Sequence, residues 1–147
     1  MKIFSCLSFC LCLAFSNLVV AQELSPVGLW KTIDDKTGKP RSLIRISETN
    51  GEYSAVVEKG LLATDAGEAV CDKCTDERKD KKIIGMTIAK GFKKNGNQYS
   101  GGEILDPDNG KIYRSKMKLD ETGNTLEVRG YIGISLLGRS QVWNRVE

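Results

Sequence analysis

The sequence predicts an all-β protein: an antiparallel up-and-down β-barrel of about eight strands that follows a cleaved signal peptide. Three observations lead to this prediction. Short runs of β-prone residues recur from Gly28 onward at roughly 8–12-residue spacing. Turn-forming pairs such as Asn-Gly and Thr-Gly separate these runs. No stretch after residue 22 carries a long helical period.

Residues 1–21 have the features of a secretory signal peptide. Lys2 gives a positive start, Ile3–Val20 is almost wholly apolar, and Ala21 ends the small-residue pattern that precedes cleavage. The apolar segment is too short and too weakly flanked to form a stable membrane span. A lipoprotein signal is the alternative, but none of the three cysteines in this segment follows the residues that such a signal requires. We therefore expect export, periplasmic or secreted, and a single β-barrel domain in residues 22–147.

The expected strands can be placed in order along this domain. Each run ends at turn residues, for example Asn50-Gly51, Asn95-Gly96 and Thr122-Gly123. The expected strands are 30–33, 43–47, 53–58, 83–89, 98–105, 111–119, 125–131 and 140–146. Sequential hairpins favour a meander, which closes into a barrel and so removes its sheet edges.

Alternation within the runs indicates which residues share a face. Ile44 and Ile46 lie on one side of their strand. In the run 111–119 one face is mostly apolar, and the other carries Arg114, Lys116 and Lys118. A charged outer face and an apolar inner face are typical of a half-solvated antiparallel sheet.

The composition excludes several kinds of site. The chain has 22 Lys and Arg, 19 Asp and Glu, a formal net charge of +3 and no His. Without His, Ser-His and Cys-His nucleophile pairs, HExxH zinc sites and His-ligated haem are excluded. The net charge is too small to imply nucleic acid or an anionic membrane as the partner. The sequence also lacks a paired-carboxylate motif, so it gives no reason to predict an enzyme or a cofactor.

Cys71 and Cys74 are the only cysteines of the predicted mature chain, and we expect them to form a disulfide. Two alternatives stay open. A redox site would need a helix N-terminus to activate a thiol, whereas this pair lies in a polar loop with acidic neighbours. A zinc site would need two carboxylate ligands besides the two cysteines.

The turn 106–110 lacks the spaced carboxylates and terminal Glu of a calcium loop, so we expect no metal there.

The polar segment 59–82 is longer than most connections in compact domains. Connections of this length are usually lids, binding loops or mobile segments. A disulfide between Cys71 and Cys74 would fix the shape of its tip. The sequence leaves open whether the segment covers the barrel opening or only decorates one connection.

The segment 129–143 holds the candidate ligand-binding residues. Three glycines interrupt an apolar run there, which allows the segment to fold over the barrel opening. Arg129 and Tyr131 share one face, and Arg139, Gln141 and Trp143 alternate together. If they face inward, the cavity has an apolar wall with a few polar anchors, and an Arg can hold a carboxylate. The alternative is that the aromatic residues are ordinary core and the arginines lie at the surface or at a barrel end.

Several motifs resemble one bacterial family. They are Gly28-Leu29-Trp30-Lys31-Thr32, Cys71-Asp72-Lys73-Cys74, the stretch from Gly101 to Tyr113 with its Asp106-Pro107, and the stretches 128–133 and 138–145. Over essentially the whole mature chain, the sequence resembles the exported family known as domain of unknown function 2147 (DUF2147). The resemblance implies a lipocalin-like (calycin) β-barrel, usually periplasmic, with no assigned chemistry. Residues 79–82 depart from the more proline-containing family pattern, so the shape of that loop is not predicted.

The resemblance also implies a structural role for Trp30. In calycin barrels, a Trp of the first strand packs across the closed end against an Arg of the last strand. Arg145 fits this position, with its guanidinium stacked on the indole and hydrogen-bonded to nearby carbonyls. Arg139 is the alternative. We expect the pair to close one end of the barrel.

Together these features predict a binding module. We expect an exported barrel that holds a small apolar or amphipathic ligand, such as a fatty acid or a related metabolite, which could bear a carboxylate. The alternative is an envelope protein-interaction or stress-related component with no small ligand. Neither interpretation involves a cofactor, nucleic acid or a membrane span after signal cleavage.

Overall fold

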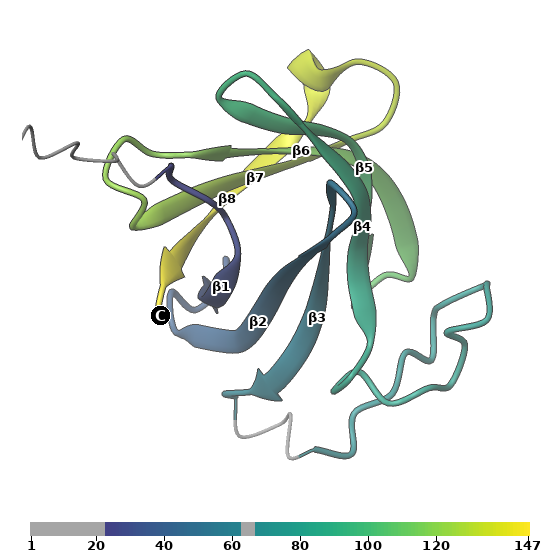
Figure 1. Ribbon diagram of the computed structural model, residues 1–147. Helices are drawn as coiled ribbons and strands as arrows, with labels where there is room; N and C mark the ends of the chain where they lie inside the picture. Colours follow the sequence, from purple (N-terminus) through teal and green to yellow (C-terminus); the bar gives the residue numbers. More distant parts are fainter. Residues whose placement is uncertain (1–22, 63–66) are drawn as a thin grey trace, which may run out of the picture.

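The computed structural model describes residues 23–62 and 67–147. In these residues it has eight strands and one short 3₁₀ helix (Figure 1). The elements are β1 (Gly28–Ile33), β2 (Pro40–Thr49), β3 (Glu52–Gly60), β4 (Thr87–Asn95), β5 (Gln98–Asp106), β6 (Lys111–Leu119), β7 (Thr125–Tyr131), the 3₁₀ helix η2 (Ser135–Leu137) and β8 (Arg139–Arg145). The signal peptide predicted for residues 1–21 lies outside the described residues.

The strands form a closed antiparallel barrel. Each strand pairs with the next one in sequence, and β1 also pairs with β8, where Trp30 lies opposite Arg145. Figure 1 shows the strands wrapped around a common interior, with the segment between β3 and β4 projecting at the bottom of the view. The predicted all-β up-and-down barrel of about eight strands is confirmed.

One predicted strand begins later than expected. We placed a strand at 83–89, but β4 begins at Thr87. Residues 83–86 form a turn instead, in which the Met86 N–H donates to the Ile83 carbonyl over 3.0 Å and Gly85 has φ +86°. A glycine tolerates this positive φ, so the apolar run breaks before the sheet begins.

The hairpin turns have the residues that their geometry demands. Asn50 and Gly51 join β2 to β3 with φ of +52° and +80°. Two successive positive φ values match the right-handed twist of the flanking strands, and Asn-Gly adopts them at low cost. This turn sets the register Thr49↔Glu52 and therefore places Ile44 and Ile46 on the inner face.

The inner faces of the strands make the core. Its largest fully buried side chains are Trp30, Phe92 and Trp143, packed with apolar residues of β2 to β7. Gly102 makes room for one of them, because a Cβ at that position would lie 2.4 Å from the Phe92 ring.

One end of the barrel, which we call the closed end, is covered by the chain before β1. The Trp30 indole donates to the Pro26 carbonyl over 2.7 Å, and the Arg145 guanidinium carbon lies 4.3 Å from the centroid of the Trp30 ring. Arg145 also donates to the carbonyls of Gly123, Val27 and Ser25 at 2.5, 2.9 and 2.6 Å. One guanidinium therefore joins β8, the β6–β7 turn and the N-terminal segment.

Replacing Arg145 by Ala should destabilise the fold by about 3 kcal/mol, because several charge-assisted hydrogen bonds and a cation–π contact are lost together. Urea denaturation measures this change. Arg114→Ala, at an exposed position of β6, is the matched control and should cost less than about 0.5 kcal/mol. Equal stability of the two variants would contradict the role given to Arg145.

Candidate functional site

The opposite end of the barrel, which we call the open end, contains a cavity of about 560 Å³. Four connections lie at this end, and their described residues are 34–39, 61–62 with 67–86, 107–110 and 132–138. The first three contribute residues to its lining, together with the adjoining ends of the strands. A volume of this size falls within the range of roughly 300–1,000 Å³ typical of small-molecule sites.

The cavity has apolar walls and a polar rim. Its walls include Ile44, Val57, Ile88, Val128 and Trp143, which belong to five different strands. Its rim, defined here as the charged and amide side chains of the lining, consists of Asp34, Asp35, Lys36, Arg41, Asp106, Asp108, Asn109, Arg139 and Gln141. Apolar walls with a few polar groups at one side can hold the apolar part of a ligand and orient its polar end.

The rim charges are paired across separate loops. Arg41 contacts Asp34 at 3.2 Å and Asp108 at 2.6 Å, which joins the β1–β2 connection to the β5–β6 turn. Asp35 accepts hydrogen bonds from Arg139 and, over 2.8 Å, from the Gln141 amide. These contacts hold the opening in one shape before any ligand arrives.

Hydrogen bonds within this rim stabilise the ionised form of Asp34. Its Oδ1 accepts hydrogen bonds from the Thr37 hydroxyl and the Thr37 N–H at 2.8 Å each. These bonds lower the pKa of Asp34, with the Thr37 hydroxyl as the largest cause and Arg41 as a smaller one. The β1–β2 connection therefore keeps a negative charge at neutral pH.

Trp143 lines the cavity with an unsatisfied donor. Its side chain is buried. Among the buried side-chain nitrogen and oxygen atoms of residues 23–62 and 67–147, only Trp143 Nε1 has no hydrogen-bond partner. The other indole, that of Trp30, is satisfied by Pro26. A buried donor without a partner costs free energy, so it is a polar feature that an acceptor on a bound molecule could relieve.

The segment between β3 and β4 is anchored to the rim. It contains the Cys71–Cys74 disulfide, and both cysteines are buried. The Lys73 ammonium donates to the Asp108 carbonyl over 2.8 Å, and Cys71 Sγ lies 3.7 Å from the Pro107 carbonyl oxygen. The segment also places Ala69, Ile83 and Ile84 in the cavity lining, so it covers part of the opening.

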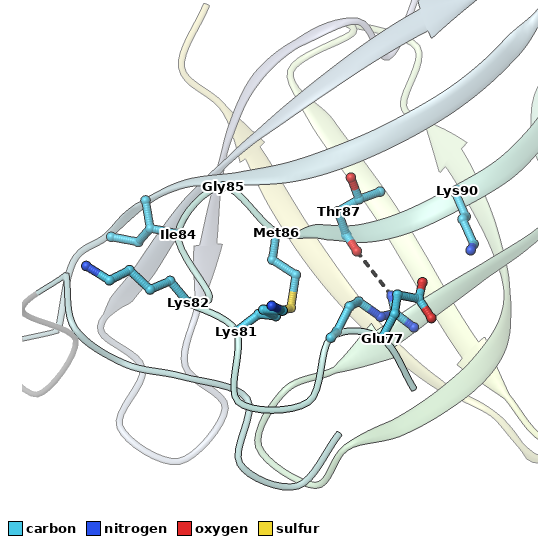
Figure 2. Close-up of a pocket in the computed structure, with 9 residues that line it drawn as sticks. Glu77, Lys81, Lys82, Ile84, Gly85, Met86, Thr87 and Lys90 are labelled. Carbon is cyan, nitrogen blue, oxygen red and sulfur yellow. Dashed lines mark hydrogen bonds between the residues drawn. The ribbon is translucent and has the colours of Figure 1, made fainter. Parts of the chain in front are cut away.

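A second cavity, of about 360 Å³, lies between this segment and the beginning of β4 (Figure 2). Arg78 donates to the Thr87 carbonyl over 3.1 Å, the bond dashed in Figure 2. Lys82 and Lys90 lie at opposite sides of the view and pair with Glu68 and Glu103 at 3.3 and 3.5 Å. This hollow is open, its three lysines are exposed, and two of them are already paired, so we place the candidate site in the barrel cavity instead.

The structure separates the predicted site residues into two groups. Arg139, Gln141 and Trp143 line the cavity, because β8 pairs with β7 at Val128↔Gln141 and Leu126↔Trp143, which puts these side chains on the inner face. Arg129 and Tyr131 are absent from the lining. They alternate with the inward-facing Val128 and therefore occupy the outer face.

Arg129 braces the β7–β8 connection. Its guanidinium donates to the carbonyls of Ser135 and Leu136 at 2.7 and 3.1 Å and to the Ser140 hydroxyl at 2.9 Å. No residue of 132–138 lines the cavity, so this glycine-containing segment does not fold over the opening as the sequence had suggested.

Sequence reasoning did not select Asp35 or Arg41. Both lie in or beside a turn that the sequence predicted, but nothing local relates them to Arg139 or Asp108, which are far along the chain. Their clustering depends on barrel closure, which brings the β1–β2 connection next to β8 and the β5–β6 turn.

Within the part of the chain that the structure describes, no group of three or more His, Cys, Asp or Glu side chains is arranged to hold a metal ion. In that same part, no helix is both long and apolar enough to cross a membrane.

Comparison with known protein families places these features in context. Residues 28–145 match the family model described as an uncharacterized protein conserved in bacteria (DUF2147). The chain belongs to the DUF2147 family. The match runs from the first residue of β1 to the last residue of β8, so the family unit is the whole barrel. No curated protein matches the chain.

The DUF2147 barrel is similar to a solved lipocalin-like structure. Protein HP1028 from the human pathogen Helicobacter pylori, described as belonging to the lipocalin family, superposes with a TM-score of 0.73 at 19% sequence identity. The similarity covers 85% of this chain and 85% of HP1028. At this identity the comparison establishes the fold alone, and that fold is lipocalin-like.

Gly110 allows the disulfide loop to pack against the β5–β6 turn. It has φ +71°, and a Cβ there would lie 1.8 Å from the Lys73 carbonyl oxygen. Gly110→Ala should therefore destabilise the fold by about 3 kcal/mol or more in urea denaturation. Gly96→Ala is the control, because Gly96 has φ +61° with open space around it and should cost only about 1 kcal/mol. A difference of zero would show that the loop does not pack as described.

Asp76 should make the stability of the β3–β4 segment depend on acid pH. Its hydrogen bonds from Arg78 lower the pKa of Asp76 from 3.8 to about 2. Because the folded pKa is depressed, the contribution is complete above pH 4, declines as the pH falls toward 2, and disappears below that. Thermal melts should thus show Asp76→Asn less stable than wild type at neutral pH, with the gap closing between pH 4 and 2.

Asp72→Asn is the control for this series, since Asp72 is exposed and its carboxylate has no ion pair or hydrogen bond among the described residues. Its difference from wild type should stay small at every pH. A gap for Asp76→Asn that persists unchanged at pH 2 would contradict the assignment.

Proposed function

We propose that this DUF2147 protein is an exported small-molecule-binding module that holds an apolar or amphipathic ligand in its barrel. The observation that carries the proposal is the cavity of about 560 Å³, which has apolar walls and a rim of fixed polar groups. Its lipocalin-like fold is consistent with ligand binding in general, and the cavity makes that general role specific to the open end.

The rim favours a ligand with a single carboxylate or a neutral polar end. Four aspartates outnumber the three cations of the lining, which disfavours a highly charged anion. Arg139 is one cation that a carboxylate can reach, because the side chains of Arg139 and its partner Asp35 are 69% and 47% exposed. Lys36 of the rim is exposed as well. Exposed pairs are weak, so a ligand carboxylate can compete for the guanidinium.

Two features support export to the periplasm or the exterior. Residues 1–21 have the charge and apolar pattern of a signal peptide. The Cys71–Cys74 disulfide fits an oxidising compartment. A periplasmic or secreted barrel would meet fatty acids and related envelope metabolites, which have the chemistry that the cavity accepts.

Native mass spectrometry of protein purified gently from its host's envelope fraction tests both halves of the proposal. We expect the mass of a chain beginning near Gln22, a two-hydrogen deficit from the disulfide, and a discrete added mass that is lost on denaturation. A full-length bare chain would contradict export and tight ligand binding together.

Filling the cavity with a larger side chain should weaken ligand binding without unfolding the barrel. Ile104 lines the cavity and is only partly buried, so Ile104→Trp should occupy ligand space and weaken binding of the fluorescent fatty acid cis-parinaric acid at least about tenfold. Ile112→Trp is the control, because Ile112 is 41% exposed and outside the lining. Equal affinity of the two variants would place the fatty acid somewhere other than the barrel.

A further inference from the structure

The β7–β8 connection exposes a cluster of aliphatic side chains. Ile132, Ile134, Leu136 and Leu137 are 66%, 60%, 82% and 78% exposed. We call these four residues the aliphatic tip. Figure 1 shows η2, which carries two of them, at the top of the view beyond the ends of β7 and β8. An exposed apolar group of this kind on a soluble domain usually marks an interaction surface.

The fold holds this tip in its exposed position. Arg129 donates to the carbonyls of Ser135 and Leu136 and to the Ser140 hydroxyl, which fixes both sides of the connection. Gly138 permits the close return to β7, because a Cβ there would lie 2.6 Å from the Gly130 carbonyl oxygen. The aliphatic side chains therefore project from a braced turn and cannot simply collapse onto the barrel.

The surroundings of the tip are positively charged. No Asp or Glu occurs between Val128 and Trp143, whereas Arg129 and Arg139 flank the tip. On the outer face of β6, Arg114 lies opposite Tyr131, one residue before the tip begins. Lys116 lies opposite Arg129, and neither Arg114 nor Lys116 forms an ion pair among the described residues.

Three carboxylates lie close to this region, and all are already engaged. Glu103 of β5 lies opposite Arg114 and pairs with Lys90 at 3.5 Å. Asp35 accepts from Arg139 and Gln141, and Glu127 accepts from the Ser140 hydroxyl at 2.7 Å. The protein's net charge of +3 does not by itself indicate a membrane partner, so the inference depends on the local arrangement of charge.

We propose that the aliphatic tip inserts into the surface of an anionic phospholipid bilayer, with Arg114 and Lys116 over the lipid headgroups. Aliphatic side chains enter the boundary between headgroups and acyl chains, and nearby cations are attracted to anionic lipid. A protruding turn with four outward side chains suits a deformable lipid surface. The proposal does not rest on the ligand-binding function.

Docking in this orientation would bring the open end of the barrel to the bilayer. Gly130 and Arg139 both line the cavity, and they immediately flank the segment that carries the tip. The rim and the tip therefore belong to the same end of the molecule. The closed end, with Trp30 and Arg145, would face away from the lipid.

Vesicle co-flotation with the purified mature chain tests the proposal. The vesicles are phosphatidylcholine alone or equimolar phosphatidylcholine and phosphatidylglycerol, at low and high salt. We expect binding to the phosphatidylglycerol vesicles that weakens at high salt. The double variant Leu136→Ser with Leu137→Ser should lose at least about tenfold in partitioning, since the bound state depends on buried apolar area.

Two further variants distinguish insertion of the aliphatic tip from non-specific adsorption of the protein to vesicles. Val27→Ser with Val146→Ser removes two exposed aliphatic residues at the closed end, 42% and 50% exposed, and should leave vesicle binding unchanged. Arg114→Ser should weaken binding to phosphatidylglycerol vesicles only. All variants should keep the wild-type melting temperature, because each substituted side chain is exposed.

The proposal is overturned if wild-type protein floats with neither kind of vesicle. It is also overturned if the tip variant binds as well as wild type, or if phosphatidylcholine alone binds as strongly as the mixture. Because the assay contains no fatty acid probe, its outcome is independent of whether the cavity binds one.

Discussion

The pairing of β1 with β8 is the contact on which the rest of the structure depends. It joins the two ends of the sheet at Trp30↔Arg145 and Lys31↔Asn144, and Leu29 extends it through backbone bonds to Val146 and Glu147. Without it the sheet would have two exposed edges and no enclosed interior. Closure gives every strand an inner and an outer face, which separates the cavity walls from the charged exterior. The Arg145 guanidinium reinforces this seam from the closed end.

The distribution of large side chains decides where a ligand could bind. Trp30, Phe92, Tyr53 and Tyr99 occupy the barrel toward the closed end, where the two tyrosine rings meet edge-on with centroids 4.8 Å apart. Toward the open end most inward residues are aliphatic or polar, with Tyr113 and Trp143 as the aromatic ones, and a cavity remains. The loops around it are joined by Arg41 and Asp35, so the opening is shaped by contacts between distant parts of the chain.

Local patterns predicted most of the barrel but only part of the site. Period-two alternation and turns such as Asn50-Gly51 act over a few residues, so strands and hairpins could be placed from the sequence. The same alternation placed Arg129 and Val128 on opposite faces of their strand. Which of the two faces points into the barrel follows only from closure of the sheet. The Arg41–Asp108 contact joins residues 67 apart and had no local signal. Gly85 broke a predicted strand because its positive φ makes a turn that apolar composition alone does not reveal.

The pairing of β1 with β8 also constrains how the barrel can fold. Every other pairing joins consecutive strands and can form as soon as its hairpin exists, whereas β1 must wait for the last residues of the chain. Such non-local contacts are the slow step in folding, because the entropy of bringing distant segments together is paid first. A chain that emerges N-terminus first would thus hold Trp30 without its contact to Arg145 until β8 is available. The seven hairpins would assemble as an open, curved sheet, and its two ends would meet only when β8 reaches β1.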